Sequence, residues 1–181
     1  MKIILDLCSG SGAWSKPYLE AGYHVRYVDL DLAGDDIRFQ RKYNLEVQGI
    51  LCAPPCDTFA VSGARWWKVK GTLALRNALS IVDACLRAVV IYKPKFWCLE
   101  NPVGRLVHYL GKPKMYFHPW EYGDPYTKKT ALWGEFNTPI KTPVEPTNKD
   151  YIHHLPPTPQ RKALRSITPS GFAKAFFEAN P

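Results

Sequence analysis

Residues 2–12 read KIILDLCSGSG, an aliphatic run that leads directly into a glycine-rich turn. The run over 2–7 predicts a buried strand, and the small residues after it predict the tight turn that ends the strand. A helix is expected over residues 14–21 and a second, parallel strand over 23–30, so that these elements form a βαβ unit. Such a turn lets a ligand approach the backbone and the N-terminus of the following helix.

The same turn indicates the size of the ligand. It lacks the third glycine of the fingerprint G-x-G-x-x-G, which binds dinucleotides, so a smaller adenosyl ligand is expected. Asp29 lies near the position, about 20 residues downstream, at which an acidic side chain holds ribose hydroxyls. A plain strand-to-helix turn without a ligand is the structural alternative.

The rest of the chain continues the alternation of strands and helices. Residues 47–52 predict a third strand, which the prolines after it must end. Apolar residues recur at helical spacing over 72–92, and residues 96–99 predict a buried strand that delivers Glu100 at its end. A last amphipathic helix is expected over 169–180. This order predicts an α/β fold of Rossmann-like type, with a mostly parallel open sheet flanked by helices and with ligands at the carboxyl ends of its strands.

The composition is that of one globular domain. The chain has 181 residues, 46% of them hydrophobic and 22% charged, which suits a single core over residues 1–181 and excludes wholesale disorder. A net charge of +8 favours a polyanionic partner. The five cysteines include no Cys-x-x-Cys pair, and no apolar run reaches membrane-spanning length. We therefore expect no disulfides, no metal, no membrane, and a reducing, cytoplasmic location.

Two polar positions follow the third and fourth predicted strands. Pro54 and Pro55 present Cys56 on a rigid loop, where solvent access and positive neighbours would favour the nucleophilic thiolate. Glu100 lies at the mouth of the next strand, where desolvation could raise its pKa enough for proton donation at neutral pH. The structural alternatives are an inert buried cysteine and an acid at a helix start.

A basic and aromatic segment lies just after the cysteine loop. Residues 65–70 read RWWKVK, a composition suited to phosphate contacts and base stacking. Lys128 and Lys129 form a second basic pair. The alternative is solvated charge beside tryptophans buried at the edge of the domain. Residues 135–160 are rich in proline, which predicts a loop that follows the surface.

Taken in order, these motifs resemble those of the cytosine-5 DNA methyltransferases. The resemblance rests on the glycine turn over 6–12, Asp29, residues 36–37, Pro-Pro-Cys at 54–56 and Glu-Asn at 100–101, and it extends to the last helix. It implies that S-adenosylmethionine binds over the glycine turn. The residues implied at that cofactor are Asp6, Cys8, Ser9, Gly10, Gly12, Asp29, Leu30, Asp36, Ile37, Pro55, Ser166 and Thr168.

The resemblance also implies a mechanism. The Cys56 thiolate would add to carbon 6 of cytosine while Glu100 protonates or hydrogen-bonds ring nitrogen 3, which makes carbon 5 nucleophilic. Asn101 would position the pieces together with the backbone near Pro54, and Lys128 takes the place of the family's arginine that faces oxygen 2. The residues expected to bind nucleic acid are Arg65, Trp66, Trp67, Lys68, Lys70 and Lys129. Because a stacked base is out of reach, the cytosine must be flipped out of a duplex or be single-stranded.

One departure from the family leaves alternatives open. Residues 134–160 are far shorter than the family's target-recognition domain, so we expect a minimal form that acts on DNA in a bacterial or phage-infected cell. The same chemistry on RNA or on a free cytosine nucleotide would need no such domain. A third alternative is a non-catalytic subunit that binds cofactor or DNA and depends on a partner protein for targeting.

Overall fold

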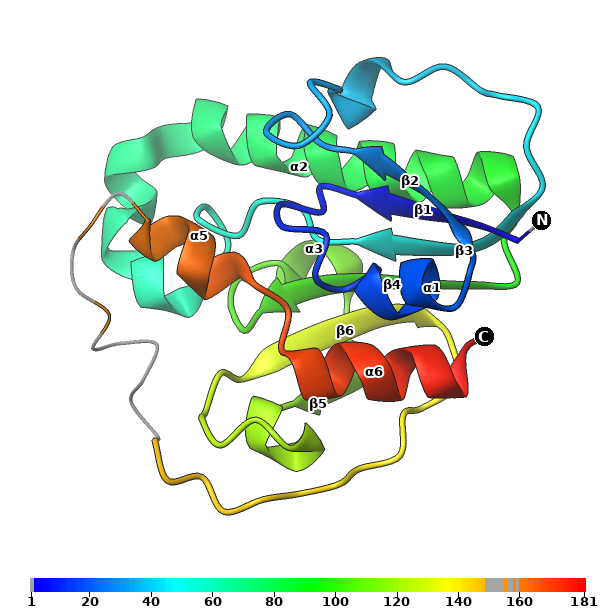
Figure 1. Ribbon diagram of the computed structural model, residues 1–181. Coiled ribbons are helices and arrows are strands. Elements are labelled where there is room, and N and C mark those ends of the chain that lie inside the picture. Colours follow the sequence, from blue (N-terminus) through cyan, green and yellow to red (C-terminus); the bar gives the residue numbers. More distant parts are fainter. Residues whose placement is uncertain (1, 149–154, 156–157, 159) are drawn as a thin grey trace.

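The computed structural model describes residues 2–148, 155, 158 and 160–181, and a six-stranded sheet lies at its centre (Figure 1). The strands are β1 (Ile3–Leu7), β2 (His24–Val28), β3 (Val47–Cys52), β4 (Phe96–Pro102), β5 (Met115–Phe117) and β6 (Thr130–Glu135). The helices are α1 (Lys16–Glu20), α2 (Trp67–Tyr92), α3 (Val107–Leu110), α5 (Arg161–Ser166) and α6 (Ser170–Ala179). Short 3₁₀ turns lie at Ile37–Phe39, Val61–Trp66 and Pro119–Tyr122.

The strands are arranged in the order β2-β1-β3-β4-β6-β5. β1 pairs in parallel with β2 and β3, and β3 pairs in parallel with β4. β6 runs antiparallel to both of its neighbours, β4 and β5. The carboxyl ends of β1, β3 and β4 therefore meet at one edge of the sheet, on the left in Figure 1. The predicted α/β class with a mostly parallel sheet is confirmed.

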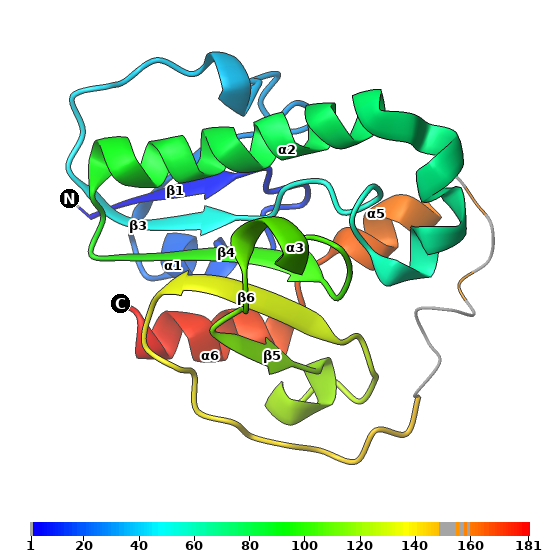
Figure 2. The ribbon, with the colours of Figure 1, turned by 180° about the vertical axis from the view of Figure 1, so that it is seen from behind.

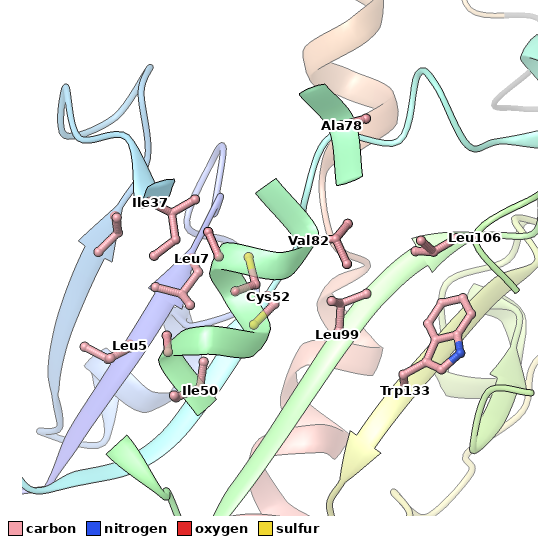
Figure 3. Close-up of a cluster of buried hydrophobic side chains, with 14 of the residues drawn as sticks. Leu5, Leu7, Ile37, Ile50, Cys52, Ala78, Val82, Leu99, Leu106 and Trp133 are labelled. Atoms are coloured by element: carbon pink, nitrogen blue, oxygen red, sulfur yellow. The ribbon is translucent and has the colours of Figure 1, made fainter. Parts of the chain in front are cut away.

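Helices cover both faces of this sheet (Figure 2). Successive residues of a strand point to opposite faces, so Leu5 and Leu7 of β1 pack beneath α2, whereas Ile4 packs toward α1 and α6. Figure 3 shows the core beneath α2, in which Val82 of the helix lies over the strands. On the opposite face, Phe172 of α6 is fully buried. Burial on both faces fixes the strand ends that carry the polar positions.

Two predicted elements differ from the observed ones at their ends. The helix predicted over 72–92 starts earlier, at Trp67, and Gly71 interrupts it with φ 70° and ψ −175°. The strand predicted over 96–99 continues through Pro102, because its pairing with β6 runs to that residue. The other predicted strands and helices agree with the structure to within a few residues at each end.

Some parts of the structure have no predicted counterpart. α3, β5, β6 and α5 are new elements, and residues 136–146, within the segment predicted as a proline-rich loop, form neither helix nor strand. The remainder of that loop includes residues 149–154, 156–157 and 159, which lie outside the described residues. Among the helices that the structure describes, none is both long and apolar enough to cross a membrane.

Candidate active site

The turn after β1 is held in a left-handed backbone conformation. Cys8, Gly10 and Gly12 have φ values of 58°, 58° and 68°. The amide of Gly10 donates a hydrogen bond of 3.0 Å to Oδ2 of Asp29, which ties the turn to the end of β2. A Cβ atom at Gly10 would meet nothing within 4 Å, so the space beside this glycine is open to a ligand. Cys8 adopts this backbone conformation in spite of its side chain, which is uncommon outside functional turns.

A buried carboxyl group lies beneath the same turn. Asp6 is 1% exposed, and its Oδ2 accepts a hydrogen bond from the Ser15 hydroxyl. Its Oδ1 has no hydrogen-bond partner among the described residues. Burial raises the pKa of Asp6 to about 7, with the Ser15 hydrogen bond opposing this effect and the charge of Asp29 adding to it. Asp6 therefore changes its protonation state near neutral pH.

Asp29 organises the segment that follows β2. Its Oδ1 accepts hydrogen bonds from the amides of Asp31 at 2.8 Å and Leu32 at 2.9 Å, while Oδ2 accepts the Gly10 amide. A carboxylate offers about four acceptor positions, so these bonds leave capacity for a ligand hydroxyl. Leu30, next to it, is 61% exposed and leaves an apolar surface beside the turn.

The other residues expected at the cofactor occupy varied positions. Asp36 accepts hydrogen bonds from the amide and guanidinium of Arg38, and the ion pair lowers its pKa. Ile37 is buried in the core beneath α2. Ser166 ends α5 and donates its hydroxyl to the carbonyl oxygen of Ala163 at 2.7 Å. The remaining residues of this set are Ser9, Pro55 and Thr168, of which Pro55 is exposed and the other two are half-buried.

Cys56 lies in the loop after β3 and is electrostatically coupled to Glu100 and Lys128. The thiol is half-buried, and burial together with the charge of Glu100 raises its pKa, while Lys128 opposes the rise. Burial also raises the pKa of Glu100, again opposed by Lys128. The expectation that solvent access would favour the thiolate is therefore wrong for the unliganded protein, because desolvation and a neighbouring carboxylate outweigh one lysine.

Asn101 connects the two strands that carry these groups. It is fully buried, and its Nδ2 donates a hydrogen bond of 3.0 Å to the carbonyl oxygen of Pro54. Pro54 is part of the Cys56 loop, and Asn101 follows Glu100 in β4. This hydrogen bond fits the positioning role expected for Asn101.

A second connection lies just beyond. Ala60 and Gly104 form an isolated antiparallel bridge, and the amide of Arg105 donates to the carbonyl oxygen of Phe59 at 2.9 Å. A Cβ atom at Gly104 would lie 1.9 Å from that same carbonyl oxygen, so only glycine permits the approach. The Cys56 loop is thus held against the segment after β4 at two places.

The basic and aromatic segment flanks this loop. Trp66 is 52% exposed with Arg65 over its ring, at 5.3 Å from guanidinium carbon to ring centroid. Lys70 donates to the carbonyl oxygen of Asp57 at 2.7 Å and pairs with its carboxylate at 3.0 Å. Trp67 is half-buried. Of the other expected cations, Lys68 and Lys129 are exposed.

Arg105 is the residue at this site that sequence reasoning missed. Its Nε donates to the carbonyl oxygen of Thr58 at 2.8 Å, and its guanidinium carbon lies 4.6 Å from the centroid of the Trp67 ring. The only available signal was a cation shortly after the Glu-Asn pair. The contact depends on the turn at Gly104, which the sequence pattern does not indicate.

Comparison with known proteins finds similarity to methyltransferases. No family model matches the chain. It is 25% identical over 133 residues to the type II methyltransferase M1.HphI of Haemophilus parahaemolyticus, which covers 61% of this chain and 35% of that protein. It is 30% identical over 124 residues to the type II methyltransferase M.DdeI of Desulfomicrobium norvegicum, a match that covers 57% of this chain and 28% of that protein. The chain therefore spans about a third of the length of these curated relatives.

A solved structure has a similar fold. It is described as a DNA modification methyltransferase encoded within a prophage of E. coli, and it superposes with a TM-score of 0.54 at 18% identity, covering 87% of this chain and 56% of that one. At this level of identity the likeness concerns the fold alone. The chain is thus similar in sequence to type II methyltransferases and has the fold of a DNA modification methyltransferase.

Proposed function

We propose that this chain transfers a methyl group from S-adenosylmethionine to carbon 5 of cytosine in DNA. The proposal rests chiefly on one observation: β3 and β4 pair in parallel, so the Cys56 loop after β3 and Glu100 near the end of β4 lie at the same edge of the sheet, and Asn101 is hydrogen-bonded to Pro54 of that loop. The two curated relatives, both type II methyltransferases, support methyl transfer to DNA. The choice of cytosine carbon 5 comes from the cysteine and glutamate pair.

The turn after β1 fits a methyl donor with an adenosyl group. The open space beside Gly10 allows close approach to the backbone, and the unpartnered Oδ1 of Asp6 offers a buried acceptor. Asp29 retains acceptor capacity for ribose hydroxyls, and exposed Leu30 offers apolar surface to an adenine ring. When bound, S-adenosylmethionine supplies an electrophilic methyl group on its sulfonium sulfur.

Cys56 and Glu100 would activate the cytosine together. The thiolate adds to carbon 6, and the electron pair displaced from the 5,6 double bond increases the electron density at carbon 5. Glu100 donates a proton or a hydrogen bond to ring nitrogen 3, which its raised pKa favours. Lys128 would face oxygen 2 and stabilise the charge that develops there. Once carbon 5 is methylated, loss of its proton and departure of the thiolate restore the aromatic ring.

The raised pKa of Cys56 determines when the thiolate forms. In the unliganded protein, burial and the charge of Glu100 keep the thiol protonated. Glu100 opposes the Cys56 thiolate only while its carboxyl group is ionised. The protonated Glu100 that donation to ring nitrogen 3 requires would leave burial as the main influence against the thiolate.

The positive surface beside the loop would hold the DNA. Arg65, Trp66 and Lys68 are exposed next to the Cys56 loop, and the chain carries a net charge of +8. Cations hold phosphates, and aromatic rings stack on unpaired bases. Such contacts suit a cytosine that has left the base stack.

Transfer of labelled methyl from S-adenosylmethionine tests the proposal. Duplex DNA, single-stranded DNA, RNA and deoxycytidine monophosphate are offered to the wild type and to Cys56→Ser. We expect label in DNA, absent with the variant, and 5-methylcytosine after digestion to nucleosides. Label in RNA or the free nucleotide alone would show that this molecule, and not DNA, is the substrate. Methylation of an exocyclic nitrogen would overturn the cysteine mechanism. No label in any acceptor, with S-adenosylmethionine binding intact, would indicate a non-catalytic subunit.

A further inference from the structure

A guanidinium group without a countercharge lies beside the loop that carries Cys56. Arg105 is anchored through Nε to the carbonyl oxygen of Thr58, and its backbone amide bonds Phe59. The Trp67 ring stacks on the guanidinium. No carboxylate among the described residues forms an ion pair with Arg105, whereas Lys70, which contacts the same loop, pairs with the Asp57 carboxylate.

Two buried donors at this place lack acceptors. Nη2 of Arg105 and Nε1 of Trp67 are both inaccessible, and neither has a hydrogen-bond partner in the described part of the chain. Leaving a buried donor unpaired costs about 1–3 kcal/mol, and more for a charged group. A strong acceptor that reached both donors would compensate this cost. Because one of them is cationic, the acceptor that compensates best is an anionic oxygen.

The position of Arg105 and Trp67 relative to Cys56 indicates which anionic oxygen they would bind. The guanidinium contacts the backbone of Thr58, which is next but one to Cys56 in the same loop. The next step rests on the function proposed above. A cytosine that lies over Cys56 brings the phosphates of its own nucleotide close to Arg105 and Trp67. We infer that Arg105, through Nη2, and Trp67, through Nε1, bind a phosphate oxygen of the nucleotide whose base reaches Cys56. A planar guanidinium is suited to a phosphate, because it can donate several hydrogen bonds in fixed directions.

The backbone offers a means of access. Trp67 belongs to the first turn of α2, and Gly71 separates that turn from the rest of the helix with its non-helical φ of 70° and ψ of −175°. A Cβ atom at Gly71 would meet nothing within 4 Å, so neighbouring atoms do not confine the break. Rotation at Gly71 would be the means by which the indole moves while residues 72–92 stay packed on the sheet, and phosphate binding requires such a movement because both donors are buried.

The competing interpretation is that Arg105 only braces the loop. Bracing needs the Thr58 hydrogen bond and the stacking contact, and it uses neither unpaired donor. Two conservative variants separate the roles. Arg105→Lys can still bond the Thr58 carbonyl but loses the second donor of the fork, and Trp67→Phe keeps an aromatic ring but loses the Nε1 donor. A brace alone would survive both changes with little effect on phosphate recognition.

The test measures binding to oligonucleotides that contain a single cytosine, as single strand and as duplex. Each phosphate around the cytosine is neutralised in turn as a methylphosphonate, and binding is measured by fluorescence anisotropy. Lys16→Ala, which removes an exposed cation on α1, serves as the control. For the wild type and Lys16→Ala we expect the binding affinity to fall roughly tenfold when one phosphate next to the cytosine is neutralised. Arg105→Lys and Trp67→Phe should bind intact DNA more weakly and should be insensitive to that one change.

Each result has a defined meaning. If Arg105→Lys and Trp67→Phe lose as much binding affinity as the wild type at every neutralised phosphate, the inference is overturned. If DNA is bound with the expected coupling but no methyl is transferred, the proposed function fails and the phosphate site stands. A parallel comparison of deoxycytidine monophosphate with deoxycytidine distinguishes a free nucleotide from a DNA backbone as the source of the phosphate. If the wild type binds neither DNA nor the mononucleotide, the inference is overturned together with the proposed function.

Discussion

Asn101 and Pro54 are joined by a 3.0 Å hydrogen bond between the Asn101 amide nitrogen and the Pro54 carbonyl oxygen. This bond ties the loop after β3, which carries Cys56, to β4, the strand that carries Glu100. The side-chain nitrogen of Asn101 thereby satisfies a carbonyl group that no strand pairing reaches at this proline. The position of the thiol relative to the carboxyl group depends on it.

Replacing Asn101 by alanine should impair the site more than the fold. We expect methyl transfer to fall about tenfold to a hundredfold, because the Pro54 carbonyl loses its partner and the loop loses its fixed position. The free energy of unfolding should fall by about 1–3 kcal/mol. Initial rates and urea denaturation measure the two effects. Asn77→Ala, at an exposed position of α2, is the control and should change neither.

The Cys56 pKa should respond in opposite directions to its two charged neighbours. Glu100→Gln removes a negative charge that raises the pKa of the Cys56 thiol, and the pKa of this thiol should therefore fall. Lys128→Gln removes the charge that lowers it, so that pKa should rise. The pH dependence of alkylation by iodoacetamide, corrected with Cys56→Ser for the other thiols, gives the values. Lys112→Gln, at an exposed lysine, should leave the thiol unchanged, and equal values in all variants would contradict the coupling.

Asp6 should make the stability of the folded protein depend on pH. Its pKa of about 7 lies above the ordinary value of 3.8, so the native state holds this proton when the unfolded state has lost it. Stability should therefore fall as pH rises from about 4 to 7, by an amount on the order of 4 kcal/mol at most, and then level off. Asp6→Asn keeps an acceptor for Ser15 and should remove this slope. Urea denaturation of both proteins at pH 5 and pH 8 measures the difference, and parallel behaviour would refute the assignment.

Gly104→Ala should disrupt the second connection of the Cys56 loop. The added methyl group would lie 1.9 Å from the Phe59 carbonyl oxygen, a backbone atom that cannot rotate away. We expect a loss of at least about 2 kcal/mol in stability and a large loss of methyl transfer. Gly63→Ala is a matched change nearby, where the methyl group would meet the Asp57 carbonyl oxygen at an ordinary 3.5 Å. It should be tolerated, and equal losses in both variants would show that the loop itself resists substitution.

The sequence is informative wherever the chain repeats a simple pattern. The apolar run of β3 and the spacing of α2 follow directly from burial on one or both faces of the sheet, and the prolines mark the end of β3. These features suffice to place Cys56 and Glu100 at neighbouring strand ends. The coupling of their pKa values in the structure agrees with that placement.

The remaining features depend on contacts between distant segments. β6 inserts antiparallel between β4 and β5, and no local pattern near residue 130 indicates its partners. The early start of α2 at Trp67 also depends on tertiary contact, since Arg105 stacks on that indole. The environment of Cys56 could not be judged from sequence either, because the loop is buried by segments such as residues 103–105 that fold back on it.

The bridge between Ala60 and Gly104 has a consequence for how the molecule opens. An isolated bridge lacks the cooperative pairing of a ladder, so it can exchange its amide hydrogens through small local fluctuations while the sheet stays intact. The half-buried thiol would be uncovered by the same event. Chemical labelling of Cys56 would then follow the lifetime of this local opening.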